Sequence, residues 1–209
     1  MTFIEECKDQ PFFCYLATYS PHTPLAAPEK FIKPFRAAGL NDTHATYLAM
    51  IENIDHNLGR LMSFLKKTER DENTILVMIN DNGVTEGLDV YNAKMRGPKC
   101  SAWEGGTRAF SFWRWPGKWK PKVLGNLTAH LDVLPTLCDL AGVQVPAKLK
   151  DKLEGYTLRP LLESEKPIAW HTDRILYHHV ARWPSGLAKS HKYAMAGVRQ
   201  GNHLMLRSH

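Results

Sequence analysis

Paired cysteines are missing from this 209-residue sequence, which has only Cys7, Cys14, Cys100 and Cys138. None of the four forms a Cys-x-x-Cys pair, so the spacing excludes a zinc ribbon and a thioredoxin-type redox motif. Most of them stand in apolar surroundings, where an unpaired cysteine behaves as a small buried hydrophobic residue. We therefore expect four buried thiols and no disulfide framework.

Long apolar runs and targeting segments are also absent. No stretch approaches the roughly 18 apolar residues that a membrane helix needs. The first six residues, MTFIEE, have neither the basic segment nor the apolar segment of a signal peptide. We expect a soluble chain that has no membrane partner and carries no targeting signal of its own.

The charge of the chain is basic but has no blocks of one sign. There are 27 Lys and Arg against 21 Asp and Glu, which gives a net charge of +6. This balance suits phosphate, sulfate or nucleic acid, but the basic residues are scattered, so we expect no nucleic-acid partner. With 44% hydrophobic residues, the composition is that of a globular protein.

The first eighty residues alternate between strand and helix patterns. Residues 11–20, PFFCYLATYS, form a continuous apolar and aromatic run that is typical of a doubly buried parallel strand. A proline-rich loop follows, and residues 43–70 then show helical spacing, with Asn41, Asp42 or Thr43 as the cap. Residues 74–80 predict a second buried strand. This order predicts an α/β fold with a mostly parallel sheet flanked by helices.

The second half of the chain changes character. RAFSFWRWPGKWKP, residues 108–121, predicts an aromatic-rich strand and a turn, and LTAHLDVLPTLCDLAGV predicts a short helix closed by Gly142. From about Pro146 the short segments and turns predict a small antiparallel unit. We expect an α/β part over residues 1–145 and a small C-terminal subdomain over residues 146–209.

Two groups of polar residues fall where these strands end. Asp81-Asn82-Gly83 ends the second strand, and His22 lies in the loop SPHTP after the first. Ligands of parallel sheets bind beyond the carboxyl ends of strands, so the two groups could share a site. Asn-Gly is also a common turn pair. The local pattern thus leaves open a simple turn or oxygen ligands for a hard divalent cation.

Lys99 lies in the segment RGPKCSAWEGGTR, residues 96–108. It could be a solvated loop lysine, or it could join His22 and a metal in a cationic pocket for a tetrahedral anion. Glu104-Gly105-Gly106 predicts a turn through which the backbone passes close to such a site.

The order of these segments resembles the sulfatase family, arylsulfatases in particular. The series PHTPLAAP, TYLAMIENIDHNLGRLMSFL, NTILVMINDNG and KCSAWEGGTRAF continues through HLDVLPTLCDLAGV and LEGYTLRPLL, over nearly the whole chain. The resemblance implies an alkaline-phosphatase-like α/β fold with a small antiparallel C-terminal subdomain. It also implies that Asp81 and Asn82 bind calcium, and that His22 and Lys99 bind the sulfate ester and assist its leaving group.

One part of the family pattern is missing from the sequence. Sulfatases carry a Cys or Ser in a Cys/Ser-x-Pro-x-Arg motif, which is oxidised to the formylglycine nucleophile, and an Asp-Asp pair that adds calcium ligands. No cysteine or serine of this chain stands in such a motif, and the pair is absent too. We expect this chain alone to be inactive, and its partners to be a sulfate-ester substrate in the complete enzyme and a missing N-terminal half.

Three interpretations remain open. The chain is the C-terminal portion of a sulfuric ester hydrolase, a phosphodiesterase or phosphonate hydrolase of the same superfamily, or a catalytically inactive sulfatase-like module. The residue at the nucleophile position would separate the first two. Family habit implies a periplasmic, lysosomal or secreted location. We expect the remaining histidines to be structural or exposed: His44, His56, His130, His178 and His179.

Overall fold

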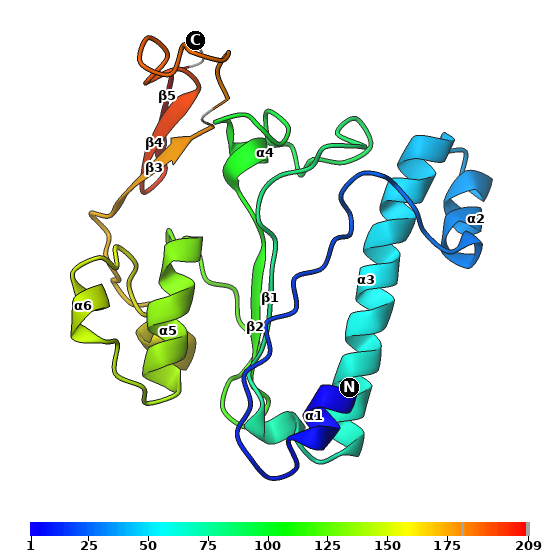
Figure 1. Ribbon diagram of the computed structural model, residues 1–209, viewed down its shortest axis with the longest axis vertical. Helices are drawn as coiled ribbons and strands as arrows, with labels where there is room; N and C mark the ends of the chain where they lie inside the picture. Colours follow the sequence, from blue (N-terminus) through cyan, green and yellow to red (C-terminus); the bar gives the residue numbers. More distant parts are fainter. Residues whose placement is uncertain (181, 208–209) are drawn as a thin grey trace. The chain divides into compact units, whose positions relative to one another are not determined.

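The computed structural model describes residues 1–180 and 182–207, which form two compact units (Figure 1). The first unit comprises Met1–Ile75 and Val84–Lys94, and the second comprises Leu76–Gly83 and Met95–His209. The boundary predicted between residues 145 and 146 falls inside the second unit and stays a prediction. Over the described residues, no helix has both the length and the apolar character needed to cross a membrane.

The first unit is built on the long helix α3, Asp42–Lys67, which the helical spacing predicted. Asn41 caps it, because its side-chain oxygen accepts a hydrogen bond from the backbone N–H of His44 at 2.8 Å. Such a bond satisfies one of the N–H groups that the first turn of a helix leaves without a partner. The unit also holds α1, Thr2–Glu6, and the 3-10 turn η1, Asp71–Asn73.

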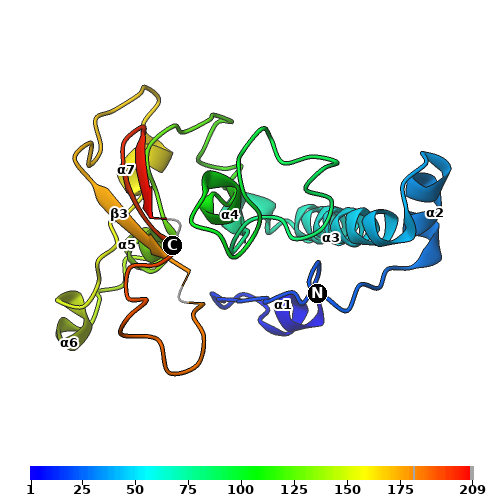
Figure 2. The same cartoon turned by 90° about the horizontal axis from the view of Figure 1, so that it is seen from above.

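Helix α2, Glu29–Ala37, lies beside the first turns of α3 (Figure 2). Phe31 and Ile32 of α2 are buried against Ala45 and Ala49, both of which are fully inaccessible to solvent. Small side chains on α3 allow the two helices to approach closely. The sequence predicted only a proline-rich loop here, whereas Pro28 ends the extended segment and stands directly before the first residue of the helix.

The predicted strand over residues 11–20 is wrong for this chain. Residues 11–19 have no regular secondary structure, and Phe13, Tyr15 and Leu16 are 72%, 83% and 75% exposed. A doubly buried strand needs a partner on each side, and the described residues provide none for this segment. Cys14 is exposed for the same reason, so the expectation of four buried thiols is also wrong, although all four cysteines are free.

The second unit contains an antiparallel pair of strands. Strand β1, Leu76–Ile79, pairs with β2, Ser111–Arg114, so that Leu76 faces Arg114 and Ile79 faces Ser111. Both strands were predicted from their apolar runs. The sequence predicted a mostly parallel sheet, whereas the strand pairs within the described residues are antiparallel. Helix α4, Glu104–Thr107, precedes β2 and lies beyond the end of the pair where β1 stops (Figure 1).

A cluster of short helices follows in the second unit. The 3-10 turn η2, His130–Asp132, leads into α5, Val133–Leu140, and Gly142 after it has φ +66°, as the predicted C-terminal glycine requires. Helices α6, Ala147–Lys150, and α7, Arg159–Glu163, come next. Their main apolar cluster consists of Leu158, Leu161, Leu162 and Trp170, with Trp113, Trp119 and Leu140 against it.

The chain ends in a three-stranded antiparallel sheet. Strands β3, Ile175–His179, β4, Ala196–Gln200, and β5, His203–Arg207, pair in sequence order. This agrees with the small antiparallel unit that the short segments after Pro146 predicted.

Candidate functional site

The turn that follows β1 carries the predicted metal ligands. Asn80 organises it, because its side-chain oxygen accepts a hydrogen bond from the Asp81 N–H at 3.1 Å and its amide group donates to the Asn82 carbonyl. The Asn82 amide in turn donates to the Asp81 carboxylate. Asp81 is exposed. The turn therefore presents a carboxylate and an amide oxygen side by side at the end of a strand.

Gly83 joins this turn to α4 by direct backbone contact. Its N–H donates to the carbonyl of Gly106 at 3.1 Å. A Cβ atom on Gly83 would lie only 1.7 Å from the carbonyl oxygen of Gly105, so no other residue fits without a shift of the backbone. The sequence predicted a turn at Glu104-Gly105-Gly106 that lets the backbone pass closely. The close approach is confirmed, and the turn is a short helix with both glycines buried.

The loop that carries Lys99 packs on the same two glycines. The Gly105 N–H donates to the Arg96 carbonyl at 2.8 Å, and a Cβ on Gly106 would lie 2.5 Å from the carbonyl oxygens of Pro98 and Ser101. Lys99 itself is half-buried, and within the described part of the chain its ammonium group has no hydrogen bond or ion pair. The structure thus brings the Lys99 loop and the Asp81–Asn82 turn onto one glycine pair.

His22 belongs to the first unit and lies in a loop with cis peptide bonds at Ser20-Pro21 and Thr23-Pro24. Its backbone N–H donates to the Tyr19 carbonyl at 3.1 Å, and its Nδ1 lies 2.8 Å from the Thr23 carbonyl oxygen. A carbonyl can only accept, so Nδ1 carries a proton. Nε2 is then the nitrogen that can exchange a proton with a ligand.

His130 was not among the predicted site residues, yet it contacts the strand-end turn. Its Nε2 lies 2.7 Å from the carbonyl oxygen of Asn80, fifty positions earlier in the chain. No local pattern around His130 indicates this contact, since it depends on how η2 packs beside the end of β1.

The residues of the strand-end turn fit a hard divalent cation in kind. Carboxylate and amide oxygens are the ligands that calcium prefers, and calcium takes 6–8 of them. Among residues 1–180 and 182–207, no group of three or more His, Cys, Asp or Glu side chains converges to hold a metal. Any calcium bound at this turn would therefore take only a minority of its ligands from Asp81 and Asn82.

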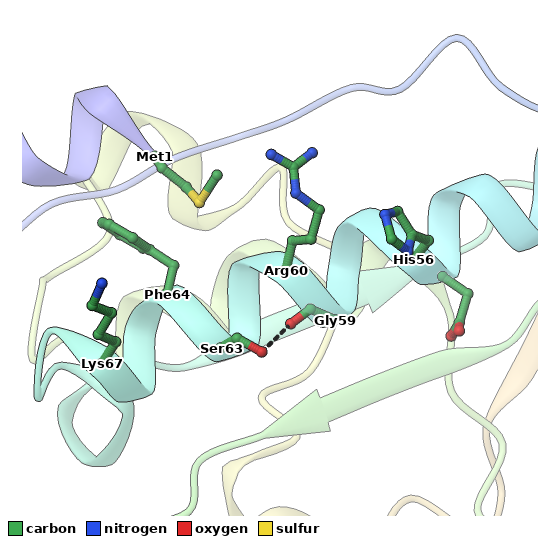
Figure 3. A pocket seen from close by; sticks show the side chains of 8 residues that line it. Met1, His56, Gly59, Arg60, Ser63, Phe64 and Lys67 are labelled. Atoms are coloured by element: carbon green, nitrogen blue, oxygen red, sulfur yellow. Dashed lines mark hydrogen bonds between the residues drawn. The ribbon is translucent and has the colours of Figure 1, made fainter. Parts of the chain in front are cut away.

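A cavity lies elsewhere, in the first unit along α3 (Figure 3). It has a volume of about 620 Å³ and opens widely to solvent, and its lining includes Met1, His56, Arg60, Phe64 and Lys67. None of the four predicted site residues lines it. The hydroxyl of Ser63 is turned back to the Gly59 carbonyl at 2.9 Å. The other polar residues of the lining are Asp55, His56, Arg60 and Lys67.

Two family models match the chain. The sulfatase model matches residues 1–143, and the model described as "N-sulphoglucosamine sulphohydrolase, C-terminal" matches residues 99–205. Among curated relatives, the uncharacterized sulfatase YdeN of Escherichia coli K12 is 35% identical over 161 residues, which is 76% of this chain and 28% of YdeN. Arylsulfatase H of Canis lupus familiaris is 29% identical over 200 residues, which is 88% of this chain and 33% of that protein. The chain thus spans about a third of their length.

Solved structures show the same relationship. The crystal structure of Ps i-CgsB has a TM-score of 0.80 and 30% identity, and the match covers 99% of this chain and 44% of that one. A phosphonate monoester hydrolase from Silicibacter pomeroyi has a TM-score of 0.59 and 23% identity over 78% of this chain and 32% of that one, which shows a shared fold. These neighbours confirm the predicted alkaline-phosphatase-like α/β class. The family-model match over residues 1–143 shows that the chain belongs to the sulfatase family.

Proposed function

We propose that this chain supplies part of the active site of an arylsulfatase-like sulfuric ester hydrolase. The observation that carries the proposal is the packing of the Asp81–Asn82 turn and the Lys99 loop on Gly105 and Gly106. This packing supports the proposal because it brings the Asp81 and Asn82 side chains and the Lys99 side chain onto neighbouring backbone segments, in a chain that belongs to a family of sulfatases.

Each of the four residues has a role that its chemistry supports. Asp81 and Asn82 would hold a calcium ion, which supplies positive charge against the sulfate oxygens when bound. The Lys99 ammonium would neutralise the charge that develops as the S–O bond breaks. His22, protonated on both ring nitrogens, would give its Nε2 proton to the leaving oxygen, while the Thr23 carbonyl accepts from Nδ1–H and fixes the ring.

The nucleophile of this proposal must come from a polypeptide outside this sequence. No Cys-x-Pro-x-Arg or Ser-x-Pro-x-Arg motif is present, and the chain covers 28% of YdeN and 33% of arylsulfatase H. We infer that this other part also adds further calcium ligands. Groups that act as one catalytic unit do little when separated, so the chain alone is expected to be inactive.

The reading frame upstream of the Met1 codon in the source genome provides the direct test. We expect it to continue and to encode the nucleophile motif and an Asp-Asp pair. The extended protein should then hydrolyse 4-nitrophenyl sulfate, whereas the 209-residue chain should not. Hydrolysis by the short chain itself, or an extended protein that is inactive with every sulfate ester tried, would contradict the proposal.

Calcium binding is tested separately by titrating the chain with calcium chloride in a calorimeter. Asp81→Asn should weaken binding, because it removes the only charged ligand of the turn. Asp89→Asn is the matched control, since this exposed carboxylate lies in a loop of the first unit, 3.6 Å from the ring of His44. Equal affinities of the two variants would remove Asp81 from the metal site.

A phosphonate or phosphate ester is the second candidate substrate. It is favoured by the fold shared with the phosphonate monoester hydrolase from Silicibacter pomeroyi. Parallel assays of the extended protein with 4-nitrophenyl sulfate and 4-nitrophenyl phenylphosphonate would rank the two reactions. An extended protein that hydrolyses neither ester would support the third interpretation, an inactive sulfatase-like module.

A further inference from the structure

We propose that His130 is a positioning residue that holds the Asp81–Asn82 turn in its ligand-presenting conformation. This inference rests on the proposed function, because the purpose of the turn is taken from it. The contact is the hydrogen bond between His130 Nε2 and the Asn80 carbonyl at 2.7 Å. Since the carbonyl can only accept, Nε2 must carry the proton and donate.

Asn80 is the residue through which such a contact acts on the ligands. Its carbonyl accepts from His130, its side-chain oxygen accepts from the Asp81 N–H, and its amide group donates to the Asn82 carbonyl. Gly83 fastens the far end of the turn to Gly106. Two contacts hold Asn80 from distant parts of the sequence: the one from His130 to its carbonyl, and the bond from its own N–H to the Phe110 carbonyl at 3.1 Å.

The segment that bears His130 is firmly held. Asp132, two residues later, is fully buried, and its carboxylate accepts from the backbone N–H of Ala129 at 2.7 Å and of Tyr156 at 2.9 Å. Arg174 donates to both oxygens of the same carboxylate. Residue 155 must be glycine, because a Cβ there would lie 1.9 Å from the Leu131 carbonyl oxygen. An imidazole mounted on such a rigid turn can fix the carbonyl that it contacts.

Two substitutions separate the role of the Nε2 donor from a general effect on the fold. His130→Gln can place an amide N–H near the position of Nε2, whereas His130→Asn is too short and resembles only the Nδ1 side of the ring. His130 is exposed, so both variants should keep the melting temperature of the unmodified chain. They differ in whether the side chain at position 130 still donates a hydrogen bond to the Asn80 carbonyl.

The experiment is amide hydrogen exchange by NMR on the full 209-residue chain, followed by titration with calcium chloride. Loss of one hydrogen bond should speed exchange at the Asp81 and Gly83 N–H groups about three- to tenfold in His130→Asn. Exchange at Gly105, whose N–H is bonded to Arg96, serves as the internal reference. His130→Asn should also weaken the calcium-induced shifts at Asp81 and Asn82, and His130→Gln should restore both properties.

The outcomes separate this inference from the proposed function. Unchanged exchange at Asp81 and Gly83 in His130→Asn would overturn the positioning role, whatever happens with calcium. Faster exchange in that variant, combined with no calcium-induced shifts in the unmodified chain, would support the positioning of the turn; absence of calcium binding in the extended protein as well would overturn the role of the turn as a metal site. Equal behaviour of the Gln and Asn variants would also overturn the assignment of Nε2 as the donor.

Discussion

Arg174 and Asp132 form a bidentate ion pair in the interior of the second unit, with N–O distances of 2.6 and 2.8 Å. The two side chains are 4% and 0% exposed. The guanidinium also lies over the rings of Tyr156 and Trp170, at 5.1 and 5.6 Å from their centroids. Because Asp132 accepts two further backbone hydrogen bonds, this pair ties η2, the segment before α7 and the start of β3 together.

Breaking this pair should destabilise the chain strongly. Arg174→Met leaves the Asp132 carboxylate buried without its counter-charge, which costs about 3–5 kcal/mol of unfolding free energy. Urea denaturation followed by circular dichroism measures the change. Arg159→Met is the matched control, since Arg159 pairs with Asp139 and Glu163 at the exposed surface. A loss in the control as large as in Arg174→Met would show that burial is not the cause.

Replacement of Gly83 should disturb the candidate site directly. In Gly83→Ala the new Cβ would meet the carbonyl oxygen of Gly105, and relief of that contact must push the strand-end turn away from α4. Overpacking of this kind costs about 1–3 kcal/mol. Calcium titration and urea denaturation should both show a loss.

Gly59→Ala is the opposite case and the control for Gly83→Ala. Gly59 lies inside α3, and nothing lies within 4 Å of the position that an added methyl group would take, so alanine should stabilise the helix by about 0.5–1 kcal/mol. If both substitutions destabilised the chain, the loss in Gly83→Ala could not be assigned to the close approach of Gly83 to Gly105.

Substitution of Asn41, the N-cap of α3, should change the stability of the first unit. Asn41→Ala removes the acceptor of the His44 N–H and should cost about 1 kcal/mol of unfolding free energy. Asn41→Asp keeps the acceptor and adds a negative charge near the positive end of the helix, so it should be neutral or stabilising. Thermal denaturation of the three proteins checks the order, and an Asp variant no better than Ala would contradict it.

The unpaired segment of residues 11–19 should make the chain associate at high concentration. It exposes Phe13, Tyr15, Leu16 and Tyr19 on an extended backbone, which is a template for pairing with another chain. Tyr15→Glu combined with Leu16→Lys should lower association without changing the melting temperature. Light scattering over a range of concentrations measures this, and unchanged scattering of the double variant would exclude the segment as the cause.

The sequence predicted those elements whose signals are local. Helix α3 has a cap, an apolar stripe and a basic end within one segment, and β1 is a short apolar run that ends in Asp-Asn-Gly. The segment over residues 11–19 misled because its apolar run indicates a buried strand, while burial depends on neighbours that the described chain does not provide. A local pattern reports what a segment can bury and cannot report whether a partner is there.

Local sequence patterns could not predict the long-range contacts of the candidate site, for the same reason. The predicted pieces, Asp81, Asn82 and Lys99, came from the ends of recognisable segments, and the glycines that bring them together were visible as Gly83 and the Gly105-Gly106 pair. The bond from His130 to Asn80 and the pair of Asp132 with Arg174 link positions 50 and 42 residues apart. Only the folded arrangement reveals such partners.

The pH dependence of stability should carry a contribution from His178 in β3. Burial lowers the pKa of His178 below its ordinary value of 6.5, and the positive charge of Arg199 lowers it further. In the unfolded chain the imidazole takes up a proton near pH 6.5, whereas in the folded chain it does so only at lower pH. The unfolded state therefore binds more protons in this window, and the free energy of unfolding falls as the pH drops below about 6.5 towards the folded-state pKa.

Urea denaturation at about pH 7.5 and about pH 5.5, on either side of the ordinary histidine pKa, measures this contribution. The unmodified chain should be less stable at the lower pH, and His178→Gln should reduce the difference between the two conditions, because glutamine has no proton to take up. Arg199→Gln should reduce it by a smaller amount, since it removes only the second cause of the lowered pKa. A pH difference that is unchanged in His178→Gln would assign the effect to other groups and remove His178 as its source.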